Sequence, residues 1–259
     1  MEAKAMRPIK LALVEPADRE QTHWRKALQF GSRYPEALQL LPAEGESCPD
    51  ADLVLLLITS YSDSRSRSFH FSGGFPRNKQ LAVLAGNAAK SAPEIRRAVV
   101  RTLDLPPERI IEVADLADFS SKLPVSLFNL HHELVIPLAR QFPIFRQQLA
   151  WEEIHATAQQ NALVGLIPVP GGDMPLMTAN QIKLVWRLAV MFDLPINARR
   201  LQEILAVIGS GFGWRILFRQ LTKLVPGPGW LIGGGLGYAG TMALGKAALE
   251  YFGRIAGQK

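Results

Sequence analysis

The first half of the chain alternates short apolar runs with segments of helical periodicity. The apolar runs cover residues 9–15, 37–42, 52–59, 80–86 and 108–114, and the helical segments cover 18–30, 92–103 and 116–141. The run LVLLLI is apolar at every position, which is typical of a strand covered by helices on both faces of a parallel sheet. This order predicts an α/β domain with a mostly parallel sheet.

The second half shows no alternation of the β type. Its segments are long, apolar and punctuated by Pro and Gly, at residues 149–170, 173–194, 197–221 and 229–252. Pro143 follows the end of a predicted helix and marks the boundary. We therefore expect an α/β domain over residues 1–141 and an all-α domain over residues 142–259.

Composition narrows the class of protein. The 259 residues are 48% hydrophobic and 20% charged, as in a folded chain with a sizeable core. The net charge of +6 fits anionic lipid or nucleic acid, and also an ordinary soluble protein. The single Cys48 excludes an internal disulfide framework and a cysteine-based metal site, and favours a reducing compartment. No apolar run precedes the first strand, so we expect no secretory signal.

The turn after the first strand has the layout of a phosphate-binding loop. Such a loop needs Gly for close backbone approach, Lys for charge and a hydroxyl for Mg²⁺. The order of elements resembles an Era-like small GTPase, whose two loop glycines fall on Glu15 and Glu20. Gln21 then replaces the lysine, and Thr22 lies at the Mg²⁺-binding hydroxyl. Two carboxylates repel phosphate, so the resemblance implies a site without its nucleotide.

Other landmarks of this resemblance are altered in the same way. PAEG (residues 42–45) stands where the family has an Asp-x-Pro-Gly turn. NAAK overlays the guanine-reading motif, with Asn87 kept and Lys90 in place of the aspartate. Lysine cannot accept the guanine N–H donors, so we expect neither GTP hydrolysis nor a nucleotide cofactor. An unrelated doubly wound sheet remains the alternative.

The second half resembles a bacterial domain of unknown function that also occurs in YcjF-type inner-membrane proteins and often follows Era-like GTPase domains. The resemblance covers about residues 151–252. Its matching residues are Pro168, Pro170, Asp173, Gln181, Pro226, Gly227, Gly229, Thr241, Ala243, Gly245 and Lys246. Because the two domains commonly occur together, this resemblance also supports the GTPase-like interpretation of the first half.

Physical roles can be assigned to some of these residues. Asp173 follows Gly-Gly, which favours a helix cap, and Gln181 is predicted to hydrogen-bond across helices. Gly233, Gly237 and Gly245 lie on one helix face with Thr241 between them. Small residues at this spacing let a second helix approach closely, in a membrane or in a soluble core.

The sequence has some features of a membrane-inserting protein but lacks a full membrane-spanning segment. Leu224 to Gly245 contains no charged residue, but Pro226 and Pro228 shorten the helix below a full span. Lys183 and Arg187 are predicted on the polar side of an amphipathic helix at an interface. Further basic residues flank these segments, as anionic lipid favours: Arg199, Arg200, Arg215, Arg219, Lys223 and Lys246. The mean hydropathy of +0.07 is too low for a polytopic protein, so we favour peripheral or hairpin insertion over a soluble bundle.

Two further clusters carry weaker signals. His131, His132 and Glu133, and the pair Glu152 and His155, are metal-ligand types, but the Glu-x-x-His spacing occurs once, so we expect no metal site. Residues 61–79 mix basic and aromatic side chains, which suits a partner contact or a solvated loop. The members are Arg65, Arg67, Phe69, Phe71, Phe75, Arg77 and Lys79.

The sequence thus predicts a non-catalytic pseudo-GTPase that acts as a scaffold or regulator at the cytoplasmic face of a membrane. A lipid surface and an active GTPase are the expected partners, and nucleic acid is disfavoured. Two alternatives stay open: a nucleotide binder with an unorthodox site, and a soluble interaction module of the cytoplasm.

Overall fold

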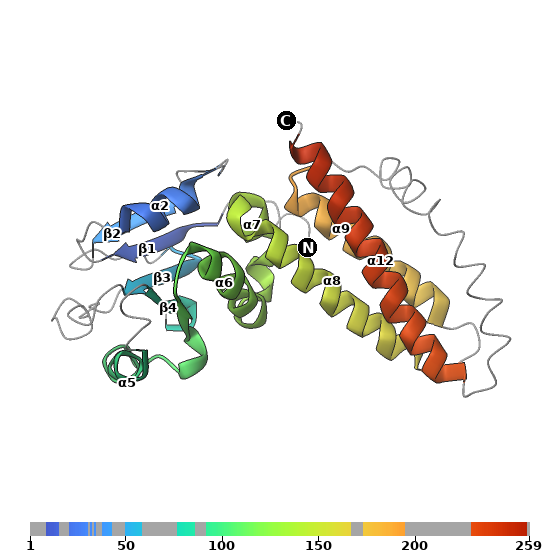
Figure 1. Cartoon of the computed structure of the whole chain (residues 1–259), viewed down its shortest axis with the longest axis horizontal. Coiled ribbons are helices and arrows are strands. Elements are labelled where there is room, and N and C mark those ends of the chain that lie inside the picture. The colour runs from blue at the N-terminus through green and yellow to red at the C-terminus, as the bar shows by residue number, and fades with distance from the viewer. Residues whose placement is uncertain are drawn as a thin grey trace. The chain divides into compact units, whose positions relative to one another are not determined.

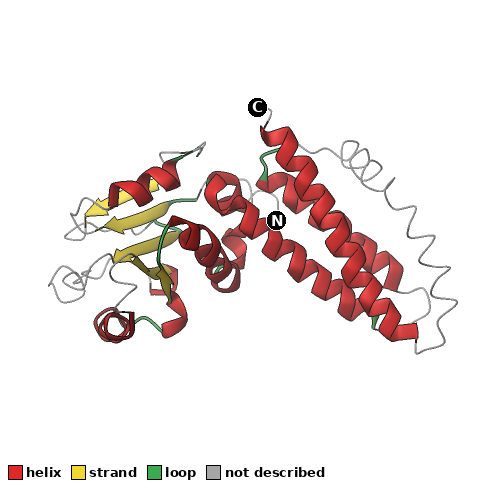
Figure 2. Cartoon of the chain, viewed as in Figure 1, coloured by secondary structure: helices red, strands yellow, loops and turns green. Residues whose placement is uncertain are grey.

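A computed structural model describes residues 9–15, 21–30, 32, 34, 38–42, 50–58, 77–85, 92–166, 173–194 and 229–257. The chain divides into two compact units, Met1–Leu149 and Ala150–Lys259. The division falls within helix α8 (Pro143–Gly165), whereas the boundary expected at residues 141/142 coincides with the break before that helix. The predicted layout of an α/β part followed by a helical part is confirmed (Figures 1 and 2).

The α/β unit contains a five-stranded parallel sheet. Its strands are β1 (Leu11–Glu15), β2 (Leu38–Pro42), β3 (Leu53–Ile58), β4 (Gln80–Ala85) and β5 (Ile110–Val113), and each lies within a run predicted from the sequence. The spatial order is β2-β1-β3-β4-β5. Leu11 of β1 is level with Leu38 of β2 and with Leu53 of β3. This is the order of a doubly wound sheet, in which ligands bind outside the carboxyl ends of the strands, where β1 meets β3.

Within the described residues of the α/β unit, four α-helices and three 3₁₀ turns accompany the sheet. The helices are α2 (Gln21–Gln29), α5 (Ala92–Leu103), α6 (Leu116–Leu130) and α7 (Val135–Gln141); the turns are η3 (Arg77–Lys79), η4 (Pro107–Arg109) and η5 (His132–Leu134). The continuous helix predicted over 116–141 is interrupted at His131, whose φ of −139° and ψ of 55° are not helical. This break separates α6 from α7.

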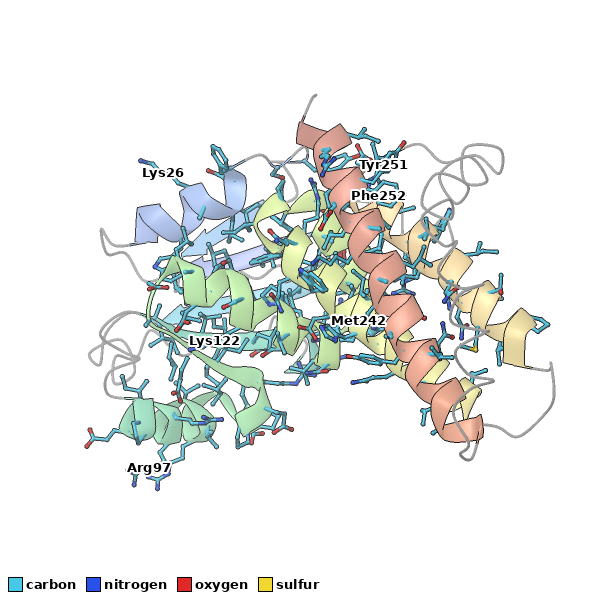
Figure 3. The ribbon with its side chains drawn as sticks, turned by 45° about the vertical axis from the view of Figure 1, so that its right-hand side comes forward. Lys26, Arg97, Lys122, Met242, Tyr251 and Phe252 are labelled. Atoms are coloured by element: carbon cyan, nitrogen blue, oxygen red, sulfur yellow. The ribbon has the colours of Figure 1, made fainter. Side chains whose placement is uncertain are left out.

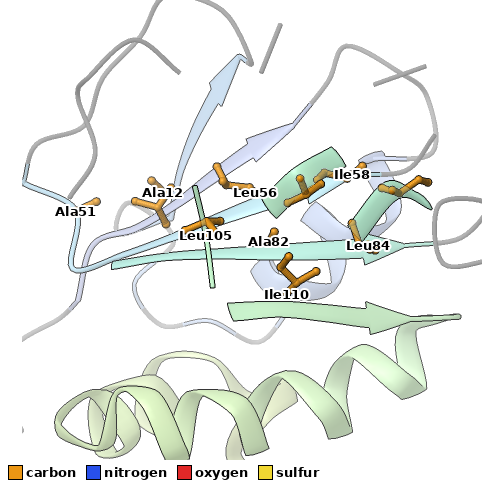
Figure 4. Close-up of a cluster of buried hydrophobic side chains, with 11 residues drawn as sticks. Ala12, Ala51, Leu56, Ile58, Ala82, Leu84, Leu105 and Ile110 are labelled. Atoms are coloured by element: carbon orange, nitrogen blue, oxygen red, sulfur yellow. The ribbon is translucent and has the colours of Figure 1, made fainter. Parts of the chain in front are cut away.

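Burial on both faces explains why β3 is apolar throughout and β4 is apolar after Gln80, since every residue of both strands is buried. One face forms the cluster in Figure 4, in which Ile95 and Val99 of α5 join alternate strand residues. The strand members are Ala12, Val54, Leu56, Ile58, Ala82, Leu84 and Ile110. The intervening residues point to the opposite face, because side chains alternate along a strand.

A group of buried aromatic rings packs between α2, α6 and α8 in the α/β unit. The ring centroids of Trp24 in α2 and Phe119 in α6 are 5.0 Å apart, and those of Phe119 and Phe145 are 5.5 Å apart. The buried Gln141 at the end of α7 accepts from the Ile9 N–H and donates to the Ile9 carbonyl, both at 3.0 Å. This paired hydrogen bond fixes the approach to β1 over a separation of 132 residues.

The helical unit contains the rest of α8, α9 (Asp173–Met191) and α12 (Gly229–Gly257). Figure 3 shows Met242 near the middle of α12 and Tyr251 and Phe252 towards its C-terminal end. Phe252 lies beside Phe192, just after α9, with ring centroids 6.2 Å apart. The apolar segment at residues 197–221, predicted as a helix, lies outside the described residues.

Candidate functional site

Three of the six degenerate nucleotide positions lie among the described residues. Glu15 is the last residue of β1, and Gln21 and Thr22 form the start of α2, although the structure does not describe their side chains. Glu20, Asn87 and Lys90 lie outside the described residues. The backbone therefore places Glu15 at the edge where doubly wound sheets bind ligands.

At the same edge, the start of α6 is capped by the chain's own carboxylates. Asp115 accepts from the Asp118 N–H at 2.9 Å, and Asp118 accepts from the Ala114 N–H at 3.1 Å. The hydrogen bond from the Lys122 ammonium at 2.7 Å, followed by that from Ala114, lowers the pKa of Asp118. These contacts occupy the segment EVADLAD, residues 112–118. They give it a capping role in this structure.

The main polar cluster of the helical unit lies between α8, α9 and α12, the helices that the structure describes there. We call Asn161, Asn180, Gln181 and Thr241 the polar network. The Thr241 hydroxyl, fully buried, accepts from the Asn161 amide at 2.8 Å and from the Gln181 amide at 3.1 Å. It donates to the Gly237 carbonyl at 2.7 Å, so its proton and both lone pairs are engaged.

Asn161 extends the polar network to α9. Its carbonyl oxygen accepts from the Asn180 amide at 2.8 Å, and its own amide also lies 3.4 Å from the Met177 carbonyl. The predicted hydrogen bond of Gln181 across helices is thus confirmed. Because the hydroxyl is fully hydrogen-bonded inside the bundle, Thr241 is held as a packing residue and is not poised as a nucleophile.

Small residues of α12 make this close packing possible. A Cβ on Gly237 would lie 2.6 Å from the Asn161 carbonyl oxygen and 2.6 Å from the Met177 methyl carbon. A Cβ on Gly245 would lie 2.6 Å from the Ile154 side chain. Gly237, Thr241 and Gly245 are four residues apart and lie on one face, as the sequence predicted. Gly240, on another face, has open space around it.

A buried ion pair joins α8 to α9 further along the bundle. The Arg187 guanidinium meets the Glu153 carboxylate through two contacts, at 2.7 Å and 2.8 Å. The side chains of Arg187 and Glu153 are 11% and 7% exposed. The prediction that Arg187 lies on a polar, interface-facing side of α9 is therefore wrong, because Glu153 draws it into the bundle. Lys183, one turn earlier, is exposed.

The other predicted motif residues have simpler positions. Gly229 is the first residue of α12, and Lys246 is exposed on it. Asp173 is the first residue of α9, but the structure does not describe its side chain, so the capping role remains a prediction. Pro226 lies outside the described residues.

Sequence reasoning missed Asn161, Asn180 and Glu153. The available signal was a set of polar side chains on otherwise apolar helical segments, at positions that the three-helix arrangement buries.

His131 and His155 have protein partners. His155 Nδ1 lies 3.3 Å from the Tyr238 hydroxyl. His131 is buried between Arg109, whose guanidinium lies 3.4 Å from Nε2, and Glu133, whose carboxylate lies 3.6 Å from Nδ1. Burial, and next the Arg109 charge, lower the pKa of His131, while Glu133 opposes this. Among the described residues, no group of three His, Cys, Asp or Glu side chains could hold a metal.

Most of the basic and aromatic segment predicted as a partner contact, residues 61–76, lies outside the described residues. Its last residues, 77–79, form the turn η3, where the Lys79 ammonium donates to the Ala51 carbonyl at 2.7 Å. Within the described part of the chain, no helix has both the length and the hydropathy needed to cross a bilayer.

Comparison with known proteins gives a limited result. The chain is 26% identical over 96 residues to magnetosome membrane protein 22 of Magnetospirillum gryphiswaldense. The match covers 34% of this chain and 49% of that protein, so the chain spans about half the length of the relative. No family model and no solved structure matches the chain.

Proposed function

We propose that this protein is a non-catalytic scaffold or regulator that associates with the cytoplasmic face of a membrane. The observation that carries the proposal is the sequence similarity to a magnetosome membrane protein. Two properties of the chain support it. Leu163 and Leu176, in the helical unit, are 66% and 50% exposed. The net charge of +6 also favours an anionic lipid surface.

For the α/β unit, we propose a GTPase-like fold of the Era type that does not use its nucleotide site. The parallel strand order β2-β1-β3-β4-β5 is compatible with this fold. β1 ends in the acidic residue Glu15 at the edge where doubly wound sheets bind ligands, and the sequence supplies no lysine there. Such a unit serves as a surface for a protein partner, and an active GTPase fits the association implied by the second domain's resemblance.

Membrane fractionation of bacterial cells that express the full chain tests the proposal. We expect recovery in the membrane pellet, with a cytosolic enzyme and an integral membrane protein of the host as markers in the same gradient. Retention after an alkaline wash indicates apolar contact with lipid, and release indicates attachment through charge. Complete recovery with the cytosolic marker contradicts membrane association.

A further inference from the structure

His131 lies between α6 and α7 and supports the chain on both sides of this break. We call His131 together with the turn η5 the α6–α7 joint. The backbone N–H of His131 donates to the Leu127 carbonyl at 2.8 Å and closes the last turn of α6. Its carbonyl accepts from the Leu134 N–H at 2.9 Å and closes η5, after which α7 begins. Because His131 and Leu134 are both buried, displacement of this one residue would open two hydrogen bonds and uncover a leucine.

The ring of His131 lies between two groups of opposite charge. Nε2 is 3.4 Å from the Arg109 guanidinium in η4, and Nδ1 is 3.6 Å from the Glu133 carboxylate in η5. Guanidinium nitrogens only donate hydrogen bonds, so the Arg109 contact requires a lone pair on Nε2. The proton of the neutral ring is then on Nδ1, where it faces the Glu133 carboxylate. The geometry therefore fits one neutral tautomer of His131.

The two charged neighbours differ in how firmly they are held. The Arg109 guanidinium donates to the Asn78 carbonyl at 2.8 Å and to the Gln80 carbonyl at 3.2 Å, which ties it to the start of β4. The Glu133 side chain is 57% exposed, so water screens its attraction to the ring. The neighbouring His132 is exposed as well. The ring thus faces an anchored cation on one side and a solvated anion on the other.

Protonation of the ring reverses the contact at Nε2. This nitrogen would then direct an N–H at another donor, and two positive charges would lie next to each other in a buried site. Burial, and next the Arg109 charge, lower the pKa of His131 in the closed arrangement. A ring released into water binds its proton more readily, so a fall in pH favours release of the ring.

We propose that the α6–α7 joint is a pH-dependent switch, closed while His131 is neutral and opened locally when its ring is protonated. Opening moves the imidazole into solvent, breaks the two backbone hydrogen bonds of His131 and exposes Leu134. The sheet stays folded, because no residue of the joint belongs to the buried cluster between the strands and α5. This switch goes beyond the proposed scaffold role, and neither proposal depends on the other.

Hydrogen–deuterium exchange of the full chain between pH 7.5 and pH 5 tests the switch. After correction for the pH dependence of intrinsic exchange, we expect opening at the His131 and Leu134 amides to increase by up to about tenfold per pH unit. The increase should begin near pH 6.5, the ordinary pKa of a free ring, and should level off once the closed ring itself takes up a proton. Peptides from α5 should keep their protection over the whole range.

Substitutions at the two charged neighbours separate charge from general loss of structure. Arg109→Gln removes the cation and should reduce the pH-dependent increase, whereas Glu133→Gln removes the opposing anion and should enlarge it. His131→Asn should abolish the increase, and His132→Asn, at the exposed neighbour, is the matched control. Circular dichroism at pH 7.5 checks that each variant is folded.

A second measurement follows the ring itself. In proton–carbon correlation spectra, the His131 Cε1–H signal is assigned by its absence from His131→Asn. Its titration midpoint should lie below the ordinary value in the wild type and should rise in Arg109→Gln, because the charge that opposes protonation is gone.

Each outcome decides for or against the switch. An increase in exchange that is confined to the joint and absent from His131→Asn supports it. If the ring titrates while exchange at the joint stays constant, the site takes up the proton without opening, and the inference is overturned. Equal loss of protection in the joint and in α5 means global unfolding and overturns it too, as does an increase that persists in His131→Asn.

Discussion

At the residue scale, Thr241 has the clearest role. One hydroxyl takes hydrogen bonds from side chains of two other helices and returns its own proton to Gly237. Removal of the Thr241 hydroxyl would lower the stability of the bundle mainly because the Asn161 and Gln181 amides would lose their acceptor. Thr241 and Gln181 are both among the residues that resemble the YcjF-type domain. Their hydrogen bond across helices gives each of them a physical role.

Replacement of Thr241 by Val keeps the shape and removes the hydroxyl. We expect a loss of about 1–3 kcal/mol in the unfolding free energy of the helical unit, because two buried donors lose their acceptor. Urea unfolding followed by far-UV circular dichroism measures it. Thr178→Val, at an exposed position of α9, is the matched control. Equal midpoints for the two variants would show that the hydroxyl contributes nothing net.

His131 makes the α/β unit sensitive to acid. Its pKa is lowered in the folded chain, chiefly by burial and then by Arg109, so the fold favours the neutral ring. This contribution is fully present above the unfolded pKa of about 6.5 and is lost as the pH falls below it. Protonation would place a second positive charge beside the Arg109 guanidinium.

Between pH 7.5 and pH 5, the unfolding free energy should therefore decrease, by at most about 1.4 kcal/mol per pH unit for this one group. Urea midpoints measured across that range test the slope. His131→Asn should flatten it, and His132→Asn, at an exposed neighbour, should leave it unchanged. A slope that is the same in all three proteins would contradict the role of His131.

At the scale of elements, the bundle depends on which glycines of α12 face a neighbour. Gly237 and Gly245 meet α8, and Gly237 also meets α9, whereas Gly240 and Gly253 have open space. Glycine lowers helix propensity wherever it stands, so close approach is the physical reason to keep it at positions 237 and 245.

Gly237→Ala and Gly240→Ala should therefore have opposite effects. The first forces a Cβ into the Asn161 carbonyl and should destabilise the helical unit by about 1–3 kcal/mol. The second only improves helix propensity and should stabilise by up to about 1 kcal/mol. Thermal unfolding under one buffer condition compares them, and shifts of the same sign would refute the packing argument.

At the scale of the whole molecule, an α/β unit with a parallel sheet precedes a helical unit. The sheet has the topology whose carboxyl edge often holds a nucleotide, yet β1 ends in Glu15 and α6 begins with carboxylates that cap its own amides. Fold alone does not determine activity, so the chemistry of that edge decides what the unit binds.

Isothermal titration of the full chain with GTP, GDP and ATP in the presence of Mg²⁺ measures that chemistry. We expect no heat of binding at micromolar concentrations, because the carboxylate of Glu15 and the loss of the lysine disfavour phosphate. An active small GTPase run under the same conditions is the positive control. Micromolar binding of any of the three nucleotides would reject the proposed inactive site.

The order of the described strands follows directly from the pattern of apolar runs. Each strand lies within a predicted apolar run because full burial on both faces leaves a continuous apolar signature, and α5 matches its predicted limits of 92–103. The break at His131 was not predicted, since the apolar pattern continues through it and local backbone angles decide the interruption.

The partners of polar side chains depend on contacts between helices and cannot be predicted from local patterns. Helical periodicity predicts Arg187 at the surface. In the structure it forms an ion pair in the interior with Glu153, which is 34 residues away in the chain. The sequence pattern likewise gives Asn161 and Asn180 no special role. The packing of α8, α9 and α12 lets Asn161 donate to Thr241 and accept from Asn180. Periodicity records which face of an element is apolar, whereas the partner of a buried polar group depends on contacts between residues far apart in the chain.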